Sequence, residues 1–169
     1  MNEEKDLQKR KSLRLKNFDY NSTGAYFVTI CTKNKECILS DIVDSVGVGA
    51  STTRNVQVQL TDIGIIVQKH LLSSERTSGV KIDRYVIMPN HIHAIILLDS
   101  SKYNVAATPS GEKLPLVISA IKRFCAKEIG ANIFQRGYYE HVIRNKDEYK
   151  ETVKYICDNP IKWEFDKSV

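Results

Sequence analysis

Long hydrophobic runs are missing from this sequence of 169 residues. One of its longest apolar stretches, residues 94–98, is far shorter than the roughly 20 residues that a transmembrane helix requires. The chain begins with Met1-Asn2-Glu3-Glu4-Lys5, so it also lacks the apolar segment of a secretory signal. These absences exclude a membrane-spanning chain and lead us to expect a cytoplasmic protein.

Cysteine is scarce and shows no pattern. The four cysteines have neither C-x-x-C spacing nor the density of a disulfide scaffold, so we expect reduced thiols at Cys31, Cys37, Cys125 and Cys157. A phosphate-binding loop of the form G-x-x-x-x-G-K-[ST] is absent as well. The sequence therefore gives no reason to expect nucleotide hydrolysis, and a chain of this length needs no metal or disulfide to fold.

The composition is that of one globular domain. Hydrophobic residues make up 42% and charged residues 27%, which excludes a disordered or collagen-like chain. We expect a single domain over residues 1–169, with a basic N-terminal arm at residues 1–16 and surface loops at residues 44–55 and 99–113. The net charge of +5 and the pI near 9.0 are compatible with a polyanionic partner.

Hydrophobic periodicity alternates between strand-like and helix-like segments. Residues 80–88 and 91–98 are typical of strands, and the Pro89-Asn90 connection predicts a hairpin. The other expected strands cover residues 25–32, 55–60 and 138–143, and the expected helices cover residues 61–73, 115–129 and 146–158. This order predicts an α+β fold, a mostly antiparallel sheet with helices packed on one face.

Two histidines open the second strand of the predicted hairpin. Since residues i and i+2 of a strand point to the same face, the imidazoles of His91 and His93 converge. Neutral imidazole is a common metal ligand, but two are not enough, and a hydrogen-bonded pair at a sheet edge is an equally good interpretation of these residues alone. His70 lies on the apolar stripe of its helix, which favours a packed structural role.

The last expected helix begins at Asn145 as N-cap, with Glu148 completing a capping box. Its apolar side chains share one sector: Tyr149, Val153, Ile156 and Cys157. Tyr155 points well away from that sector and is displayed, which by itself is typical of a surface tyrosine. Asn159 lies on the same side as Tyr155 if the helix continues for one more turn.

Several segments resemble one family. Residues 88–98, MPNHIHAIILL, resemble the histidine–hydrophobic–histidine (HUH) signature of single-tyrosine transposases. Residues 134–166, FQRGYYEHVIRNKDEYKETVKYICDNPIKWEFD, resemble the REP-associated tyrosine transposases of bacteria, and residues 11–32 and 59–71 are similar to the same family. The resemblance spans nearly the whole chain in the family's order.

The resemblance implies roles for four residues. His91, His93 and Asn159 are then the ligands of a divalent metal, Mg²⁺ or Mn²⁺, and Tyr155 is the nucleophile. The implied fold is a ferredoxin-like palm, a sheet of four to five strands with the histidines on a central strand and the catalytic tyrosine on a C-terminal helix. The implied enzyme nicks and rejoins single-stranded or hairpin DNA through a 5′-phosphotyrosine, in transposition or in the processing of repeat hairpins.

Basic residues outside this site are candidates for binding DNA. Arg123 and Lys127 lie four residues apart on the outward side of their expected helix, and Arg10, Lys11, Arg14 and Lys16 belong to the N-terminal arm. Solvated surface charge is the alternative for each of them. No general base stands out: Lys154 and Arg144 are candidate electrostatic helpers and His141 a candidate proton relay.

Two other classes of function compete with the enzyme. One is a sequence-specific DNA-binding protein, derived from a transposase, that no longer cuts. The other is an RNA-binding module, which needs stacking aromatic residues on its central strands, whereas residues 91–98 offer only imidazole and aliphatic side chains. The sequence leaves open whether the protein is a monomer or a homodimer and whether Tyr155 acts within its own subunit.

Overall fold

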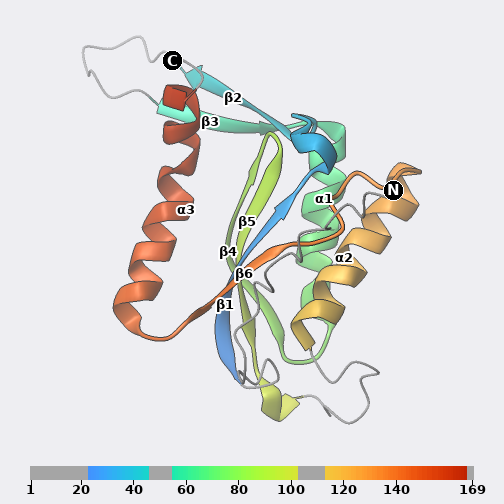
Figure 1. The fold of residues 1–169 in the computed structure, drawn as a ribbon, viewed down its shortest axis with the longest axis vertical. Coiled ribbons are helices and arrows are strands. Elements are labelled where there is room, and N and C mark those ends of the chain that lie inside the picture. Colours follow the sequence, from blue (N-terminus) through green and yellow to red (C-terminus); the bar gives the residue numbers. More distant parts are fainter. Residues whose placement is uncertain (1–22, 46–54, 103–112, 167–169) are drawn as a thin grey trace, which may run out of the picture.

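The structure is a computed structural model that describes residues 23–45, 55–102 and 113–166 (Figure 1). Its main sheet has four strands in the order β4-β5-β1-β6, and every neighbouring pair is antiparallel. The strands are β1 (Gly24–Cys31), β4 (Val80–Met88), β5 (His91–Leu98) and β6 (Tyr139–Ile143). Helix α1 (Asp62–Ser73) precedes β4, and α2 (Lys113–Ile129) joins β5 to β6, which gives the ferredoxin-like β-α-β-β-α-β order. The expected fold class is confirmed.

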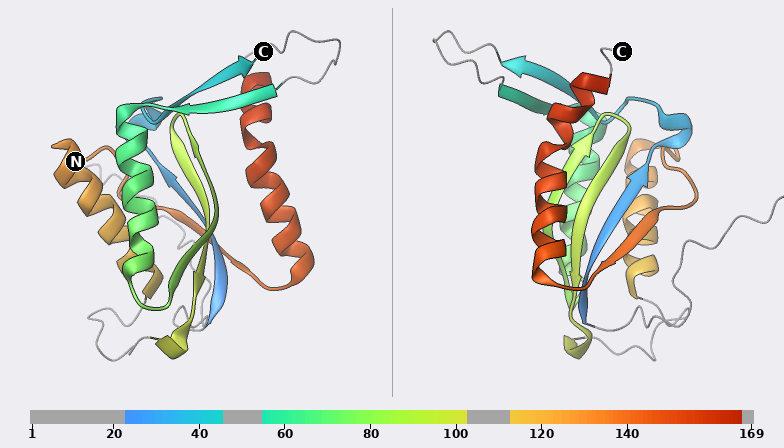
Figure 2. Two further views of the ribbon diagram at one scale, coloured as in Figure 1. Left: turned by 180° about the vertical axis from the view of Figure 1, so that it is seen from behind. Right: turned by 60° about the vertical axis from the view of Figure 1, so that its left-hand side comes forward.

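One face of the sheet packs against α1 and α2 and forms the main core (Figure 2). Alternate residues of β5 and β1 point into it because successive side chains of a strand alternate between faces. The core unites the fully buried Tyr26, Val28 and Ile96 of the sheet with Leu71 of α1 and Ile118 of α2. Burial of each such aliphatic side chain stabilises the fold by about 1.5–3 kcal/mol.

Helix α3 (Lys146–Asp166) lies on the opposite face, so the helices cover both faces of the sheet rather than the one that we expected (Figure 2). The reason lies in β5, which also carries apolar side chains on its second face, at Ile95 and Leu97. Tyr149, Val153 and Ile156 of α3 pack against them, whereas Cys157, expected in the same sector, is exposed.

Asn145 caps the start of α3 as the sequence predicts, but Glu148 accepts from the Arg144 amide instead of completing the predicted capping box. The amides of Asp147 and Glu148 donate to Asn145 Oδ1 at 3.0 and 2.8 Å. The helix does not end near residue 158 but continues through Pro160 to Asp166. Proline removes one helical hydrogen bond, and the extra turns bring Trp163 to within 5.9 Å of the His91 ring, measured between ring centroids.

The strands β2 (Ser40–Ser45) and β3 (Asn55–Leu60) pair in a separate two-stranded ribbon that contacts α3. The expectation of a surface loop over residues 44–55 is therefore wrong at both ends, because residues 44 and 45 belong to β2 and residue 55 to β3. In the other expected loop, residues 100–102 form a 3₁₀ turn; residues 46–54 and 103–112 and the arm at residues 1–16 lie outside the described residues. Over the described ranges, no helix has the length and apolar character to cross a bilayer.

Candidate active site

His91 and His93 of β5 meet on the face that α3 covers. They alternate along the strand with Ile92 and Ala94, which belong to the main core. The Nε2 atoms of the two imidazoles lie 3.0 Å apart. Strand geometry thus brings two ring nitrogens to one point.

A chain of hydrogen bonds fixes the orientation of both rings. Asn90 Oδ1 accepts from His91 Nδ1 at 2.7 Å, since an amide oxygen has no proton to donate. The lone pair of a neutral His91 then lies on Nε2 and accepts the Nε2 proton of His93. His93 Nδ1 in turn accepts from the Thr29 hydroxyl at 2.9 Å. Each imidazole therefore presents its Nε2 to the shared point.

Burial keeps both histidines neutral. It lowers the pKa of His91 to about 4, against a hydrogen bond with the Asn159 side chain, and the charge of Lys35 lowers it further. Burial and the neighbouring His91 lower the pKa of His93 to about 3. Neutral imidazole is the form that binds metal ions, and His93 coordinates through Nε2 when its proton lies on Nδ1, where the Thr29 hydroxyl oxygen can accept it.

Asn159 reaches the histidines from α3. Its side chain is buried, 8% exposed, and hydrogen-bonds that of His91. Within the described ranges, there is no group of three or more His, Cys, Asp or Glu residues that could hold a metal ion. The available donor set is therefore two neutral imidazoles and one amide, which fits a divalent ion such as Mn²⁺ or Mg²⁺ and leaves positions for other oxygen ligands.

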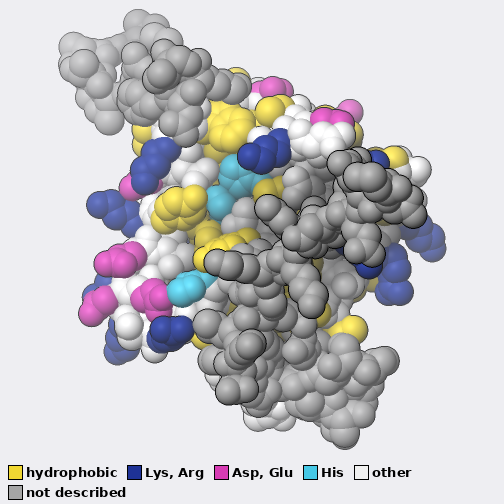
Figure 3. Space-filling view, in the orientation of Figure 1, with side chains coloured by type: hydrophobic (Ala, Val, Ile, Leu, Met, Phe, Trp, Pro, Cys, Tyr) yellow, Lys and Arg dark blue, Asp and Glu magenta, His cyan; other side chains and the backbone are white. Residues whose placement is uncertain are grey.

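Tyr155 lies beside this pair, one helical turn before Asn159. The centroid of its ring is 5.2 Å from that of His93 and 5.9 Å from that of Phe27. The residue is 42% exposed and lines a shallow hollow with Phe27, Glu151 and Thr152. A single chain thus brings the phenol and the imidazoles to one surface, where histidine side chains emerge among hydrophobic and basic ones (Figure 3).

Among the described contacts, none joins the groups weighed as helpers to Tyr155. His141 pairs with Glu148, whose second oxygen accepts from the Arg144 backbone amide at 2.7 Å. Lys154 is exposed. The cation that contacts the phenol ring is instead Lys162, whose Nζ lies 5.6 Å from the centroid of Tyr155.

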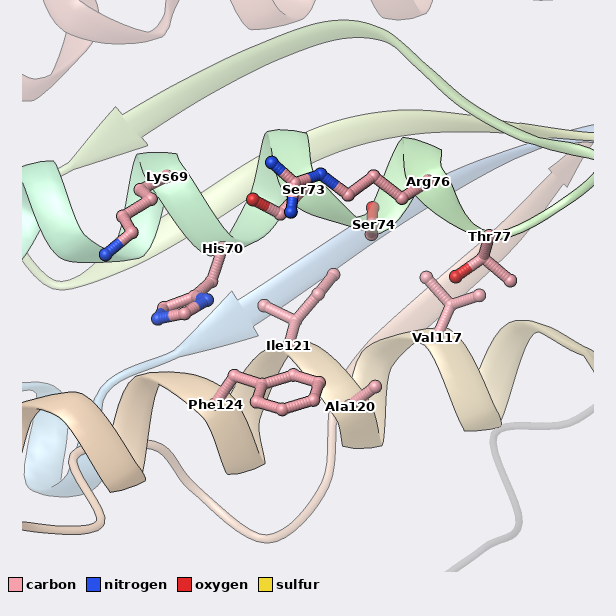
Figure 4. Close-up of a pocket in the computed structure, with 10 residues that line it drawn as sticks. All are labelled: Lys69, His70, Ser73, Ser74, Arg76, Thr77, Val117, Ala120, Ile121 and Phe124. Carbon is pink, nitrogen blue, oxygen red and sulfur yellow. The ribbon is translucent and has the colours of Figure 1, made fainter.

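A second hollow, of about 490 Å³, lies between α1 and α2 on the other side of the sheet (Figure 4). In it, His70 bonds Glu128 at 2.8 Å and stacks on Phe124. Phe124 is 46% exposed, although its spacing predicts a buried position. His70 thus ties α1 to α2 and lies apart from the histidine pair.

Two of the six predicted DNA-binding residues are described, and both lie away from the histidine site. Arg123 and Lys127 are exposed on α2, on the other side of the sheet. Arg123 lies over the Phe124 ring, 5.1 Å from its centroid. The remaining four, Arg10, Lys11, Arg14 and Lys16, lie outside the described residues.

Sequence reasoning missed the residues that orient the histidines. Asn90 directly precedes the H-x-H motif, so its position in the turn was a usable signal. Thr29 had none, because its contact with His93 depends on the register of β1 against β5. Lys162 and Trp163 lie beyond the expected end of the last helix.

Comparison with known proteins gives three relatives, although no family model matches. An uncharacterized protein of Haemophilus influenzae is 36% identical over 180 residues, covering 95% of this chain and 93% of that protein. A REP-associated tyrosine transposase of Escherichia coli is 28% identical over 118 residues, covering 69% of this chain and 66% of that protein. A solved structure of a REP-associated tyrosine transposase bound to a REP hairpin superposes with a TM-score of 0.60 at 22% identity, over 83% of this chain and 68% of that one.

The fold and these matches first define the class. The chain shares one family with the Haemophilus protein and has the fold of a tyrosine transposase. The resemblance that its motifs indicate is borne out to this extent: the chain is similar in sequence to a REP-associated tyrosine transposase and has the fold of one.

Proposed function

We propose that this protein is a metal-dependent single-stranded DNA endonuclease and strand transferase. The observation that carries the proposal is the meeting of Tyr155 with the His91 and His93 pair, with Asn159 joined to His91. A nicking enzyme needs its nucleophile to lie beside side chains that can hold a cation near the phosphate. The similarity to transposases supports DNA as the substrate, and the E. coli relative and the hairpin-bound structure point to hairpin-forming repeats.

The cleavage reaction uses the chain's own residues as follows. Tyr155 Oη attacks the phosphorus of a backbone phosphate, the P–O3′ bond breaks, and the DNA stays joined to the protein as a 5′-phosphotyrosine. The phenol proton passes to solvent, and the departing 3′ oxygen takes a proton from solvent as a free hydroxyl. Reversal of these steps by another 3′ hydroxyl rejoins the strand. His91, His93 and Asn159 would hold a divalent ion, which would supply Lewis-acid charge to the phosphate when bound.

Covalent capture of DNA tests the proposal. Wild-type protein is incubated with Mn²⁺ and a random-sequence pool of short, labelled single-stranded DNA, and adducts that resist detergent are counted on a gel. We expect adducts with the wild type and none with Tyr155→Phe or after chelation of the metal.

Tyr149→Phe is the matched control. Tyr149 lies on the same helix, but its hydroxyl donates to Asp83 Oδ2 at 2.5 Å and is held there. This variant should still form adducts. If the wild type shifts the same DNA in a native gel but forms no adduct, the protein is a non-cleaving DNA-binding protein and the proposal is wrong.

The contact between Tyr155 and His93 within one chain supports action in a single subunit. Mixing a His93→Asn variant with a Tyr155→Phe variant should then restore no adduct. Restored adducts in the mixture would show that two subunits share one site.

A further inference from the structure

A hollow of about 600 Å³ adjoins the histidine pair on the side that α3 leaves open. Its lining includes Thr29 and Cys31 of β1, Lys33 of the following turn, and Arg136 and Tyr139 before and in β6. The volume is in the range of small-ligand sites in proteins. It is ample for one nucleotide.

The hollow begins one strand away from the candidate metal ligands. Thr29 lines it and also bonds His93 Nδ1 at 2.9 Å. Tyr139 is the partner of Thr29 across the β1–β6 ladder, so its side chain stands on the same face. A DNA strand with a phosphate at Tyr155 and His93 would have this hollow beside its next nucleotide.

Backbone hydrogen bonds hold the two walls together. Lys33 N donates to Ile133 O at 2.7 Å, and Gln135 N donates to Cys31 O at 3.0 Å. From behind, Lys122 Nζ donates to the carbonyl oxygens of Gln135 and Gly137 at 2.8 and 2.7 Å. The hollow is therefore built into the fold before any ligand arrives.

The turn at its rim is strained. Asn34 and Lys35 both have left-handed backbones, with φ of 54° and 57°, which is uncommon for residues other than glycine. The Asn90 side chain, which also orients His91, donates to Lys35 O at 3.4 Å and helps to hold this turn. Strained conformations persist where the surroundings fix them and are frequent at ligand-binding sites.

The side chains that face the hollow match a nucleotide. Lys33 and Arg136 are exposed, and over the described part of the chain neither has an ion-pair partner. Tyr139 is 45% exposed, which leaves its ring open to stacking. Two cations suit a phosphate and an open aromatic ring suits a base.

We propose that this hollow is the subsite for the nucleotide next to the cleaved phosphate, with its base on Tyr139 and its phosphate at Lys33 and Arg136. This inference rests on the proposed function for the position of the cleaved phosphate. Its binding part does not need cleavage and is testable without it.

The test is the binding of fluorescein-labelled oligo(dT), followed by anisotropy, to chains that carry Tyr155→Phe and so cannot cut. Adding Tyr139→Ala should weaken binding roughly tenfold, the scale of one lost base stack. Tyr139→Phe, which keeps the ring, should bind as its parent does. Lys33→Ala with Arg136→Ala should reduce the slope of log affinity against log salt by about 0.7, the contribution of one phosphate contact on a single strand.

The matched control removes the same two charges from the opposite edge of the sheet. Lys81→Ala with Arg84→Ala changes exposed residues of β4 and should leave the salt slope nearly unchanged. Equal losses in both double variants, or unchanged affinity in Tyr139→Ala with its thermal melt preserved, would overturn the subsite. Failure of the wild type to form adducts, with these binding differences intact, would instead overturn the proposed cleavage alone.

Discussion

The two faces of strand β5 differ: one is apolar along the strand, whereas the other carries two histidines before the apolar Ile95 and Leu97. Toward α1 and α2 it presents Ile92, Ala94 and Ile96, all fully buried in the main core. Toward α3 it presents His91 and His93, whose nearest partners are each other, Asn90 and Thr29. The alternation of a strand thus lets one segment hold the sheet together and position chemical groups at once.

The histidines on the two sides of the sheet show the same difference. His70, between α1 and α2, bonds the carboxylate of Glu128 and joins two helices. His91 and His93 have no such carboxylate in contact among the described residues, and burial holds them neutral. A neutral imidazole pair favours metal binding. The environment, not the residue type, separates a structural histidine from a candidate ligand.

The largest expected effect separates stability from chemistry. Ile96→Ala removes a fully buried side chain from the main core and should lower the free energy of unfolding by about 2–5 kcal/mol. Tyr155→Phe, on the half-exposed face, should change it by less than about 0.5 kcal/mol while it abolishes DNA adducts. Urea unfolding of both variants measures these changes in the free energy of unfolding. A Tyr155→Phe variant as destabilised as Ile96→Ala would contradict the prediction.

The pH dependence of stability should come mainly from the α3 face. The folded-state pKa values of His91 and His93, about 4 and about 3, lie below the ordinary value of 6.5, so the unfolded chain binds protons first. Stability should therefore fall as pH drops below 6.5 and level off near the folded-state values, by at most roughly 3 kcal/mol for His91 and roughly 5 kcal/mol for His93. Urea unfolding at several pH values measures this slope, and a variant with His91→Gln and His93→Gln should show a shallower one. An equally steep slope in that variant would place the effect elsewhere.

A single hydrogen bond to His93 should tune metal binding. Thr29→Val keeps the shape of the side chain but removes the hydroxyl that orients the ring, so we expect about a 10–100-fold loss of Mn²⁺ affinity by calorimetry. Thr29→Ser, which restores the hydroxyl, should recover most of it. Equal affinity in the valine variant would show that the ring needs no such support.

The smallest expected effect lies between α1 and α2. Hydrogen bonds from Lys69 and His70 lower the pKa of Glu128, so the stability that its carboxylate contributes is present above its ordinary value of 4.5 and is lost as pH falls through the lowered one. Glu128→Gln should lower the melting temperature slightly at neutral pH, because exposed ion pairs contribute little. The difference from wild type should vanish in strong acid. Adduct formation should not change.

The sequence predicted what depends on local pattern. Strand alternation gave the shared face of His91 and His93, and helical spacing gave the display of Tyr155 and its alignment with Asn159. Long-range packing lay beyond reach: the face on which α3 lies, the contact of Thr29 with His93, and the pairing of β2 with β3. These depend on register and on competition between two apolar faces of β5, which no single segment encodes.

The central claim is that Tyr155 is the group that captures DNA beside the histidine pair. Adducts made with Mn²⁺ and the random pool of single-stranded DNA are digested with trypsin and nuclease, and the nucleotide-bearing peptide is identified by mass spectrometry. Cleavage after Lys154 and Lys162 yields residues 155–162, in which Tyr155 is the only tyrosine. We predict a phosphonucleotide on this peptide. A nucleotide on any other peptide, or none in metal-loaded wild-type protein, would contradict the claim.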